Sequence, residues 1–142
     1  MYYGKCFLCG RWGLLEEHHI FGGANRKLSE KYGLKVGLCG ISCHREGSEA
    51  AHRCAETAQM LHEYGQKKFM NEQGATINEF RAVFGKNYLE VPMKFRVFGE
   101  MTIYVDTVAE VEAESADEAI QMAAQHFGGE DMEIEWKKAE VI

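Results

Sequence analysis

The chain has 142 residues, of which 46% are hydrophobic and 27% are charged. These values are ordinary for a globular protein and exclude an intrinsically disordered chain. No apolar run approaches the roughly 20 residues of a membrane-spanning helix, and the first residues lack a signal-peptide core, so we expect a cytoplasmic protein without membrane contact. The net charge of −6 is uneven: residues 1–90 carry +2 and residues 91–142 carry −8. Residues 1–90 can therefore bind DNA without strong electrostatic repulsion.

The first part of the chain begins with short predicted strands and turns in residues 1–22, which are rich in glycine and aromatic residues. A loop at Gly22–Asn25 follows, and then a short apolar stretch around Val36 and Leu38. Residues 44–72 contain few glycines and many helix-forming residues, which predicts a long helix with a loose first turn and an end at Gly74.

A second, shorter helix is predicted after Gly74. Thr76-Ile77-Asn78-Glu79 matches a capping box, so the helix begins there, runs through Phe84 and ends at Gly85. Pro92 is the only proline, and it falls where the charge balance changes. We place the domain boundary there, with one domain in residues 1–90 and a second in residues 91–142.

The second domain is predicted to be a small α+β module with the order β-β-α-β. Residues 94–104 and 108–113 alternate like a strand pair, Ser115-Ala116-Asp117-Glu118 is a capping box for a helix through Phe127, and residues 132–136 alternate like a final strand. With about fifty residues the module is near the lower limit for an independent core. Its negative charge favours contact with protein rather than with DNA. We expect it to form a homodimer, to bind another protein or to inhibit the first domain. A purely structural role is at least as good an alternative.

Five cysteines fall in a chain that we expect in a reducing compartment, where disulfides are improbable. Cys6 and Cys9 form one close pair, and Cys39 and Cys43 form a second. Two such pairs about thirty residues apart predict a closed four-cysteine zinc site, since thiolates suit zinc and four of them complete its coordination shell. The alternative is two buried or redox-active pairs. Cys54 lies outside this pattern and is predicted to be a small buried residue.

Histidines gather around the same cysteine pairs. His18 and His19 are adjacent, and neighbouring residues on an extended segment point to opposite sides. One ring can then bind a cation while the other faces water or a phosphate, which are the two requirements of phosphodiester hydrolysis. The alternative is that these histidines are surface residues or additional zinc ligands. His44 and His52 lie close to the second cysteine pair in the sequence, whereas His62 and His126 are expected elsewhere.

Residues 6–52 resemble HNH (His-Me finger) endonucleases, in the subgroup whose cysteine knuckles clamp a ββα-metal motif. The resemblance rests on Cys6-x-x-Cys9, on Glu16-Glu17-His18-His19-Ile20 and on Leu38-Cys39-x-x-x-Cys43-His44. The stretch from His18 to Leu89 is similar to small proteins of bacteriophages and prophages. The resemblance implies a treble-clef-like, zinc-stabilised α+β nuclease core followed by helices, in a bacterial host cell.

The resemblance also implies a role for each histidine. His19 matches the general base, with its ring held by a backbone carbonyl. His18 and His44 match ligands of the catalytic divalent cation (Mg²⁺, Mn²⁺, Ni²⁺ or Zn²⁺), with His44 at the start of the motif's helix. The third ligand is usual at the position of Ser48, so we take His52 as a displaced ligand that a loop at Gly47 brings back. Asn25 is the nearest candidate for the motif asparagine that braces the hairpin.

The expected function is metal-dependent DNA cleavage by a phage or prophage endonuclease. Two alternatives remain: a four-cysteine zinc module that binds DNA without cutting it, and an interaction protein in which the zinc domain is a scaffold. Six cations near the site are candidates for contacts with DNA phosphates. They are Arg26, Lys27, Lys31, Lys35, Arg45 and Arg53.

Overall fold

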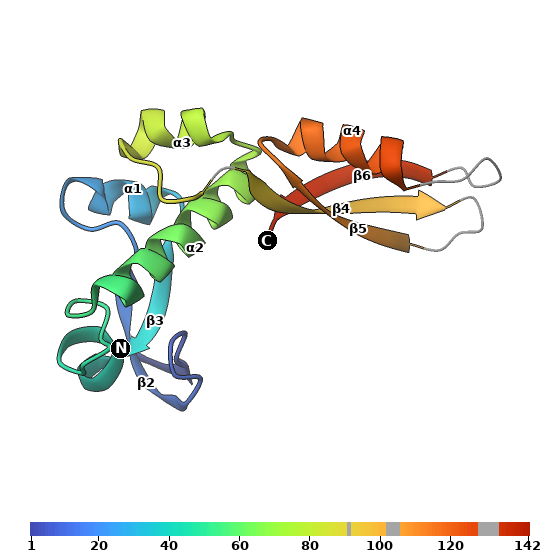
Figure 1. Cartoon of the computed structure of the whole chain (residues 1–142). Coiled ribbons are helices and arrows are strands. Elements are labelled where there is room, and N and C mark those ends of the chain that lie inside the picture. The colour runs from blue at the N-terminus through green and yellow to red at the C-terminus, as the bar shows by residue number, and fades with distance from the viewer. Residues whose placement is uncertain (91, 102–105, 128–133) are drawn as a thin grey trace. The chain divides into compact units, whose positions relative to one another are not determined.

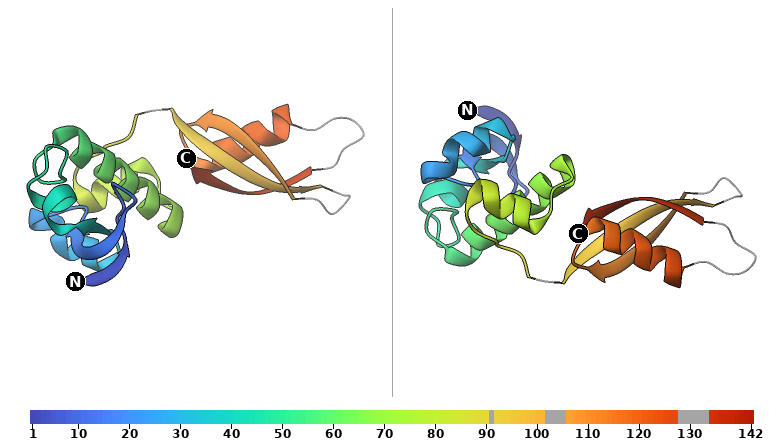
Figure 2. Two further views of the ribbon diagram at one scale, coloured as in Figure 1. Left: turned by 90° about the horizontal axis from the view of Figure 1, so that it is seen from below. Right: turned by 90° about the horizontal axis from the view of Figure 1, so that it is seen from above.

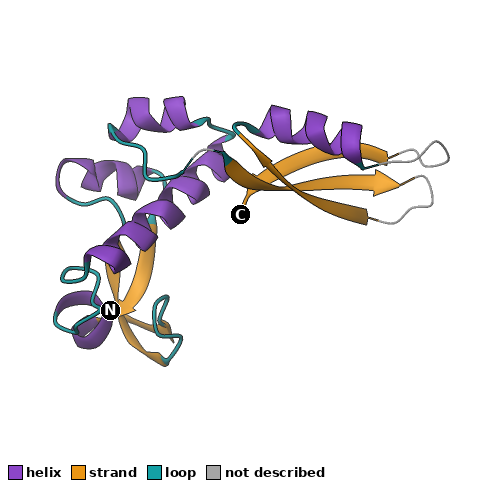
Figure 3. Ribbon diagram, in the orientation of Figure 1, coloured by secondary structure: helices purple, strands orange, loops and turns teal. Residues whose placement is uncertain are grey.

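The computed structural model describes the chain except for residues 91, 102–105 and 128–133 (Figure 1). It divides into two compact units, Met1–Tyr88 and Leu89–Ile142. Both units combine helices with a small antiparallel sheet, so the predicted α+β class is confirmed (Figure 3). Within the described ranges, no helix has the length and apolar character needed to cross a membrane.

The sheet of the first unit has the order β1-β2-β3, with strands Tyr2–Lys5, Trp12–His19 and Lys35–Cys39. The central strand β2 pairs with β1 along its first half and with β3 along its second half. Side chains alternate along a strand, so Glu16 and His18 lie on one face of β2, and Glu17 and His19 lie on the other. The sheet therefore separates the two adjacent histidines as the sequence predicts.

The predicted helix over residues 44–72 begins later than expected, at Ala55. A π-helical turn follows β3, and the chain then doubles back, so that the Ala51 and His52 amides bond to the Cys43 and His44 carbonyls. Gly47 permits this return, because a Cβ there would lie 2.0 Å from the Ser42 carbonyl oxygen. His44 consequently lies in the π-helical turn and not at the start of a helix. The helical segments of this unit are η1 (Gly23–Asn25), α1 (Arg26–Lys31), η2 (Gly40–Arg45), α2 (Ala55–Gln73) and α3 (Ile77–Phe84).

The helix boundaries after residue 70 agree with the prediction. Gly74 and Gly85 end α2 and α3 with φ angles of 62° and 86°, a backbone region that glycine enters without steric cost. The capping box at the start of α3 is present: Thr76 accepts from the Glu79 amide, and the Glu79 carboxylate accepts from the Thr76 amide. Local sequence rules therefore suffice for this part of the fold.

The core of the first unit joins α2 and α3 to the end of the sheet. Phe80 and Phe84 pack with ring centroids 4.6 Å apart, and Phe21 packs on Phe84 at 4.7 Å. Ser29 is fully buried in α1, where its hydroxyl accepts from the Phe21 amide and donates to the Phe21 carbonyl. These two hydrogen bonds fix the segment that follows β2. His19, the last residue of β2, is held close to this core.

The second unit consists of β4 (Met93–Met101), β5 (Asp106–Ala113), α4 (Ala116–His126) and β6 (Ile134–Val141), with sheet order β5-β4-β6. The helix lies against one face of this sheet (Figure 2). Phe95 and Val97 of β4 and Ala119 and Ala123 of α4 are buried between them.

The order β-β-α-β agrees with the prediction for the second unit, with differences at the ends. Residues 102–104 and 132–133 of the predicted strands lie outside the described residues, and β6 continues to Val141. The Ser115 hydroxyl caps α4 by accepting from the Glu118 amide. The Glu118 carboxylate accepts from the Glu114 amide instead of the Ser115 amide, so only half of the predicted capping box forms.

Candidate metal centres and active site

Four cysteine sulfurs converge where β1 and β3 end. Cys6 and Cys9 lie in the turn after β1, Cys39 ends β3 and Cys43 lies in η2. Their sulfur atoms all lie within 4.8 Å of one another, and all four thiols are free. The Cys9 and Cys39 sulfurs are 3.7 Å apart, close to the edge of about 3.8 Å that a tetrahedron with Zn–S bonds of about 2.3 Å has. The four cysteines could therefore hold a zinc ion.

Backbone amides stabilise negative charge on Cys6 and Cys9 of this cluster, whereas burial raises the pKa of Cys39 and Cys43. The Arg11 amide is the main cause that lowers the pKa of Cys9 to about 6, and the Cys39 amide donates to the Cys6 sulfur at 3.5 Å. Such N–H···S contacts stabilise thiolates, which are the form that binds zinc. Cys54 is not part of the cluster: it precedes α2, is half-buried rather than buried, and its thiol donates to the Glu56 carboxylate at 3.2 Å.

Three histidine rings form a second cluster next to the cysteines. His18 comes from β2, His44 from η2 and His52 from the loop before α2, and their ring centroids lie 4.8 to 5.1 Å apart. Each offers one nitrogen to a group whose atoms all lie within 4.8 Å of one another. Burial, together with His52 and His44, lowers the pKa of His18 to about 4. His18 is thus neutral near pH 7, as a metal-binding imidazole must be.

Glu16 orients one ring of this histidine cluster. The Nδ1–H of His44 donates to Glu16 Oε2 at 2.8 Å, and Arg45 Nη2 donates to Glu16 Oε1 at 3.0 Å. With Nδ1 engaged, Nε2 of His44 is the nitrogen that can face a cation. A carboxylate behind a metal-binding histidine is a common way to fix its tautomer and direction. The sequence contains a signal for Glu16, since it lies two residues before His18 and so on the same face of β2.

The Glu16–His44 contact predicts the effect of Glu16→Gln. We expect this variant to bind a divalent cation at the histidine cluster about 10- to 100-fold more weakly, since the carboxylate orients His44. Isothermal titration of the zinc-loaded protein with Ni²⁺ measures this affinity. Glu17→Gln is the matched control because Glu17 lies on the opposite face of β2. Equal Ni²⁺ affinities of Glu16→Gln and the wild type would contradict the assignment.

A cavity of about 260 Å³ opens beside the histidine cluster. His18, His19 and His52 all line this cavity. At the end of β2, residues from both faces of the strand are therefore in contact with the same cavity. His62 also lines this cavity from α2, although the sequence placed it elsewhere; its ring stacks on Phe21 at 5.4 Å. The sequence contains no signal for it, because only the packing of α2 decides which of its faces meets β2. The lining residues are His18, His19, Ile20, Gly22, Ala51, His52, Ala58, Leu61 and His62.

His19 is held by a carboxylate and not, as expected, by a backbone carbonyl. Its Nε2–H donates to Glu30 Oε1 of α1 at 2.5 Å, which leaves Nδ1 as the nitrogen that can accept a proton. The hydrogen bond from Lys35 is the main cause that lowers the pKa of Glu30, and the hydrogen bond from His19 lowers it further. Glu30 is therefore ionised and suited to hold the His19 ring. Glu30 is eleven residues away from His19, and no sequence pattern connects them.

Glu17, His19 and Glu30 also lie close enough to be considered as a cation site. An ammonium group already fills that place: Lys35 Nζ lies 3.1 Å from Glu17 and 2.9 Å from Glu30. Both carboxylates raise the pKa of Lys35 and keep it charged. We therefore interpret this group as an ion-pair network that supports His19, and Lys35 as one of its members.

Asn25 does not brace the β2–β3 pair. Its side-chain amide donates to the Phe84 carbonyl at 3.1 Å and so ties η1 to the end of α3. Asn25 falls in this position because η1 and α1 separate it from both strands. The buried Ser29, for which the sequence contains no signal, fixes the segment after His19 instead.

The six cations expected near DNA are distributed around the site. Arg26, Lys27, Lys31 and Arg53 are exposed, and Arg45 is 53% exposed beside Glu16. The sixth, Lys35, is paired with Glu17 and Glu30 as described above. Five of the six are thus accessible to a phosphate.

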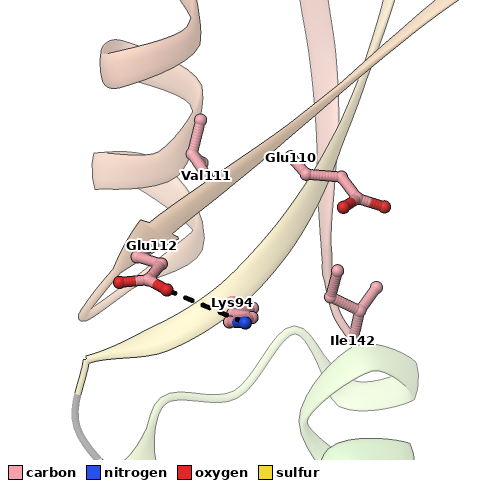
Figure 4. Close-up of a pocket in the computed structure, with 5 residues that line it drawn as sticks. All are labelled: Lys94, Glu110, Val111, Glu112 and Ile142. Atoms are coloured by element: carbon pink, nitrogen blue, oxygen red, sulfur yellow. Dashed lines mark ion pairs between the residues drawn. The ribbon is translucent and has the colours of Figure 1, made fainter.

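The second unit has a pocket of different character. A pocket of about 190 Å³ lies among Lys94, Glu110, Val111, Glu112 and Ile142 (Figure 4). Lys94 faces Glu112 at 3.9 Å, and Glu110 pairs with Arg96 at 3.1 Å. Exposed ion pairs of this kind contribute little and offer no acid–base or metal-binding set.

The candidate site therefore lies in the first unit, where a four-cysteine cluster, a three-histidine cluster and a carboxylate-held histidine are close in sequence and space. Among the described residues these are the groups whose donor atoms fit a metal and a proton acceptor. No family model, curated protein or solved structure matches this chain.

Proposed function

We propose that the first unit is a metal-dependent endonuclease that hydrolyses DNA phosphodiester bonds. The observation that carries the proposal is the cavity at the end of β2. It is lined by His19, a ring with one nitrogen held by Glu30, and by His18 and His52 of the histidine cluster. A proton acceptor beside a cation site is the minimum that phosphodiester hydrolysis requires.

Each group has a defined part in the proposed reaction. Nδ1 of His19 takes a proton from a water molecule, whose oxygen attacks phosphorus while the bond from phosphorus to the leaving oxygen breaks; the leaving oxygen then takes a proton from solvent. Glu30 stabilises the imidazolium that forms, through the existing hydrogen bond to Nε2. His18, His44 and His52 would hold the cation, which supplies positive charge for the phosphate and the leaving oxygen.

The donor set favours some cations over others. Three imidazole nitrogens suit Zn²⁺ and Ni²⁺ better than Mg²⁺, which prefers oxygen ligands and retains its water. We therefore expect stronger activity with Ni²⁺ or Zn²⁺ than with Mg²⁺. The four cysteines would hold a separate structural zinc ion with no open position for chemistry.

The proposal is tested by incubating supercoiled plasmid DNA with the protein and each of the four cations Mg²⁺, Mn²⁺, Ni²⁺ and Zn²⁺, beside the variant His19→Ala. Loss of a positioned general base lowers the rate of nicking by about 10²- to 10⁴-fold. His126→Ala is the matched control, since His126 lies in α4 of the second unit, and it should nick at the wild-type rate.

Two results would overturn the proposal. Equal nicking by His19→Ala and the wild type would remove His19 from the mechanism. Binding of DNA without nicking under any of the four cations would favour a zinc module that only binds DNA.

A further inference from the structure

The outer part of the β1–β2 hairpin carries three large side chains that remain exposed. Tyr3, Trp12 and Leu14 have exposed fractions of 69%, 68% and 64%. The register pairs Tyr3 with Leu14, and alternation places Trp12 and Leu14 on the same face of β2. We name these three residues the hairpin stripe. Its exposure is costly in water unless a partner covers it.

The hairpin stripe lies on the face of β2 that also carries the candidate metal centre. From Trp12 the strand continues through Leu14 and Glu16 to His18, which all alternate onto one side. The six steps from one residue to the next between Trp12 and His18 span about 20 Å at about 3.3 Å per step. A few nucleotides bridge such a distance, so a DNA strand whose phosphate lies at the histidines reaches the hairpin stripe.

The chemistry of the hairpin stripe fits nucleobases. The Tyr3 and Trp12 rings are inclined by only 28°, with centroids 6.2 Å apart, and both keep about two thirds of their surface exposed. Nearly parallel, exposed rings are the platforms on which unpaired bases stack. In a duplex the base faces are covered by their neighbours, so the rings could not reach them without unpairing the strands.

Positive charge accompanies the hairpin stripe at both ends. Lys5 is exposed and lies opposite Trp12 in the register. Arg45 is 53% exposed and pairs with Glu16, the residue of this face that lies between Leu14 and His18. A cationic path with aromatic rings along it matches a single strand, whose phosphates are attracted by the cations while its bases stack. A purely apolar protein partner has no charged groups that would pair with these cations.

From these observations we propose that the hairpin stripe binds the unpaired bases of a DNA strand, so that the substrate of the first unit is single-stranded DNA or DNA with an unpaired segment next to the cut. The inference rests on the proposed function for the position of the cut. The binding of unpaired bases itself is measured without cleavage.

Trp12 provides its own reporter, because the only other tryptophan is Trp136 in the second unit. In the double variant His19→Ala, Trp136→Phe, we expect a single-stranded oligonucleotide of mixed sequence to quench Trp12 fluorescence. The same oligonucleotide annealed to its complement should bind more weakly and quench little. Fluorescence anisotropy of labelled DNA then gives the affinity of Trp12→Ala and Tyr3→Ala, each made in the His19→Ala protein.

Loss of one stacking ring is expected to weaken single-strand binding about 10- to 100-fold. Phe127→Ala, an exposed aromatic residue of the second unit, is the matched control and should bind normally. Zinc content and circular dichroism establish that the variants fold. Because Trp12 and Tyr3 are largely exposed, their truncation removes little packing.

Two outcomes would overturn this inference. One is equal affinity for single strand and duplex with no effect of Trp12→Ala. The other is a dimer, detected by sedimentation without DNA, that Trp12→Ala dissociates, since the hairpin stripe would then serve a second copy of the chain. If single strands bind through Trp12 but the active protein cuts no DNA, the proposed hydrolysis fails while the binding site stands.

Discussion

Cys9→Ser is expected to release the zinc ion and unfold the first unit. Cys9 is exposed, and its sulfur lies 3.7 Å from that of Cys39, so serine in its place loses little packing and the effect arises from the metal. Binding of structural zinc supplies on the order of 10–16 kcal/mol to small sites, which is comparable to the whole stability of a domain, about 5–15 kcal/mol. Without this contribution, the free energy of unfolding of the first unit is expected to fall to zero or below.

The measurement combines zinc content by mass spectrometry with thermal unfolding followed by circular dichroism. The wild type should hold one zinc ion per chain, and a chelator should reproduce the effect of the substitution. Cys54→Ser is the matched control, since Cys54 lies outside the cluster, and it should retain zinc and its unfolding temperature. A folded, zinc-free Cys9→Ser protein would refute the structural zinc site.

His18→Ala is expected to abolish the proposed DNA cleavage by removing the buried ligand of the histidine cluster. The ring of His18 lies 5.1 Å from that of His44 and 5.0 Å from that of His52. Stabilisation of developing charge by a bound cation is worth several kcal/mol, so its loss lowers the rate on the order of 10³-fold or more. Plasmid nicking at saturating Ni²⁺ or Mn²⁺ measures the rate, and titration with Ni²⁺ measures the lost affinity.

Because His18 is buried, His18→Ala also removes packing. His52→Ala provides the second variant, since His52 is exposed and its truncation leaves the core intact. Both variants should lose Ni²⁺ affinity and activity together, whereas His19→Ala should lose activity and keep Ni²⁺ affinity. Normal Ni²⁺ binding by both His18→Ala and His52→Ala would exclude the histidine cluster as the cation site.

The elements that the sequence predicts well are those decided by neighbouring residues. Gly74 and Gly85 end helices because their positive φ angles are set locally, and Thr76 caps α3 through a residue three positions away. The opposite orientation of His18 and His19 follows from strand alternation alone. The spacing of the two cysteine pairs likewise indicates four sulfurs that meet, because short knuckles leave the chain few other ways to place them.

The contacts that the sequence missed depend on packing between distant segments. The start of α2 at Ala55, later than predicted, depends on the close approach of Gly47 to the Ser42 carbonyl. Glu30 reaches His19 because α1 packs beside the end of β2. His62 lines the cavity because α2 turns the face with Ala58, Leu61 and His62 toward it. Asn25, the candidate for the bracing asparagine, contacts Phe84 at the end of α3 for the same reason. The spacing of residues within one segment does not show which distant segment they will contact.

Gly65 lies within α2, where glycine costs a helix about 1 kcal/mol relative to alanine. A Cβ at this position would lie 2.6 Å from the Ile20 side chain and 2.9 Å from the Phe21 ring. The helix thus meets the segment after β2 through its backbone, one turn away from His62. Backbone atoms have no rotamers, so this contact between α2 and the segment after β2 does not rearrange. The separation between the histidines of β2 and α2 is therefore preorganised before any substrate binds.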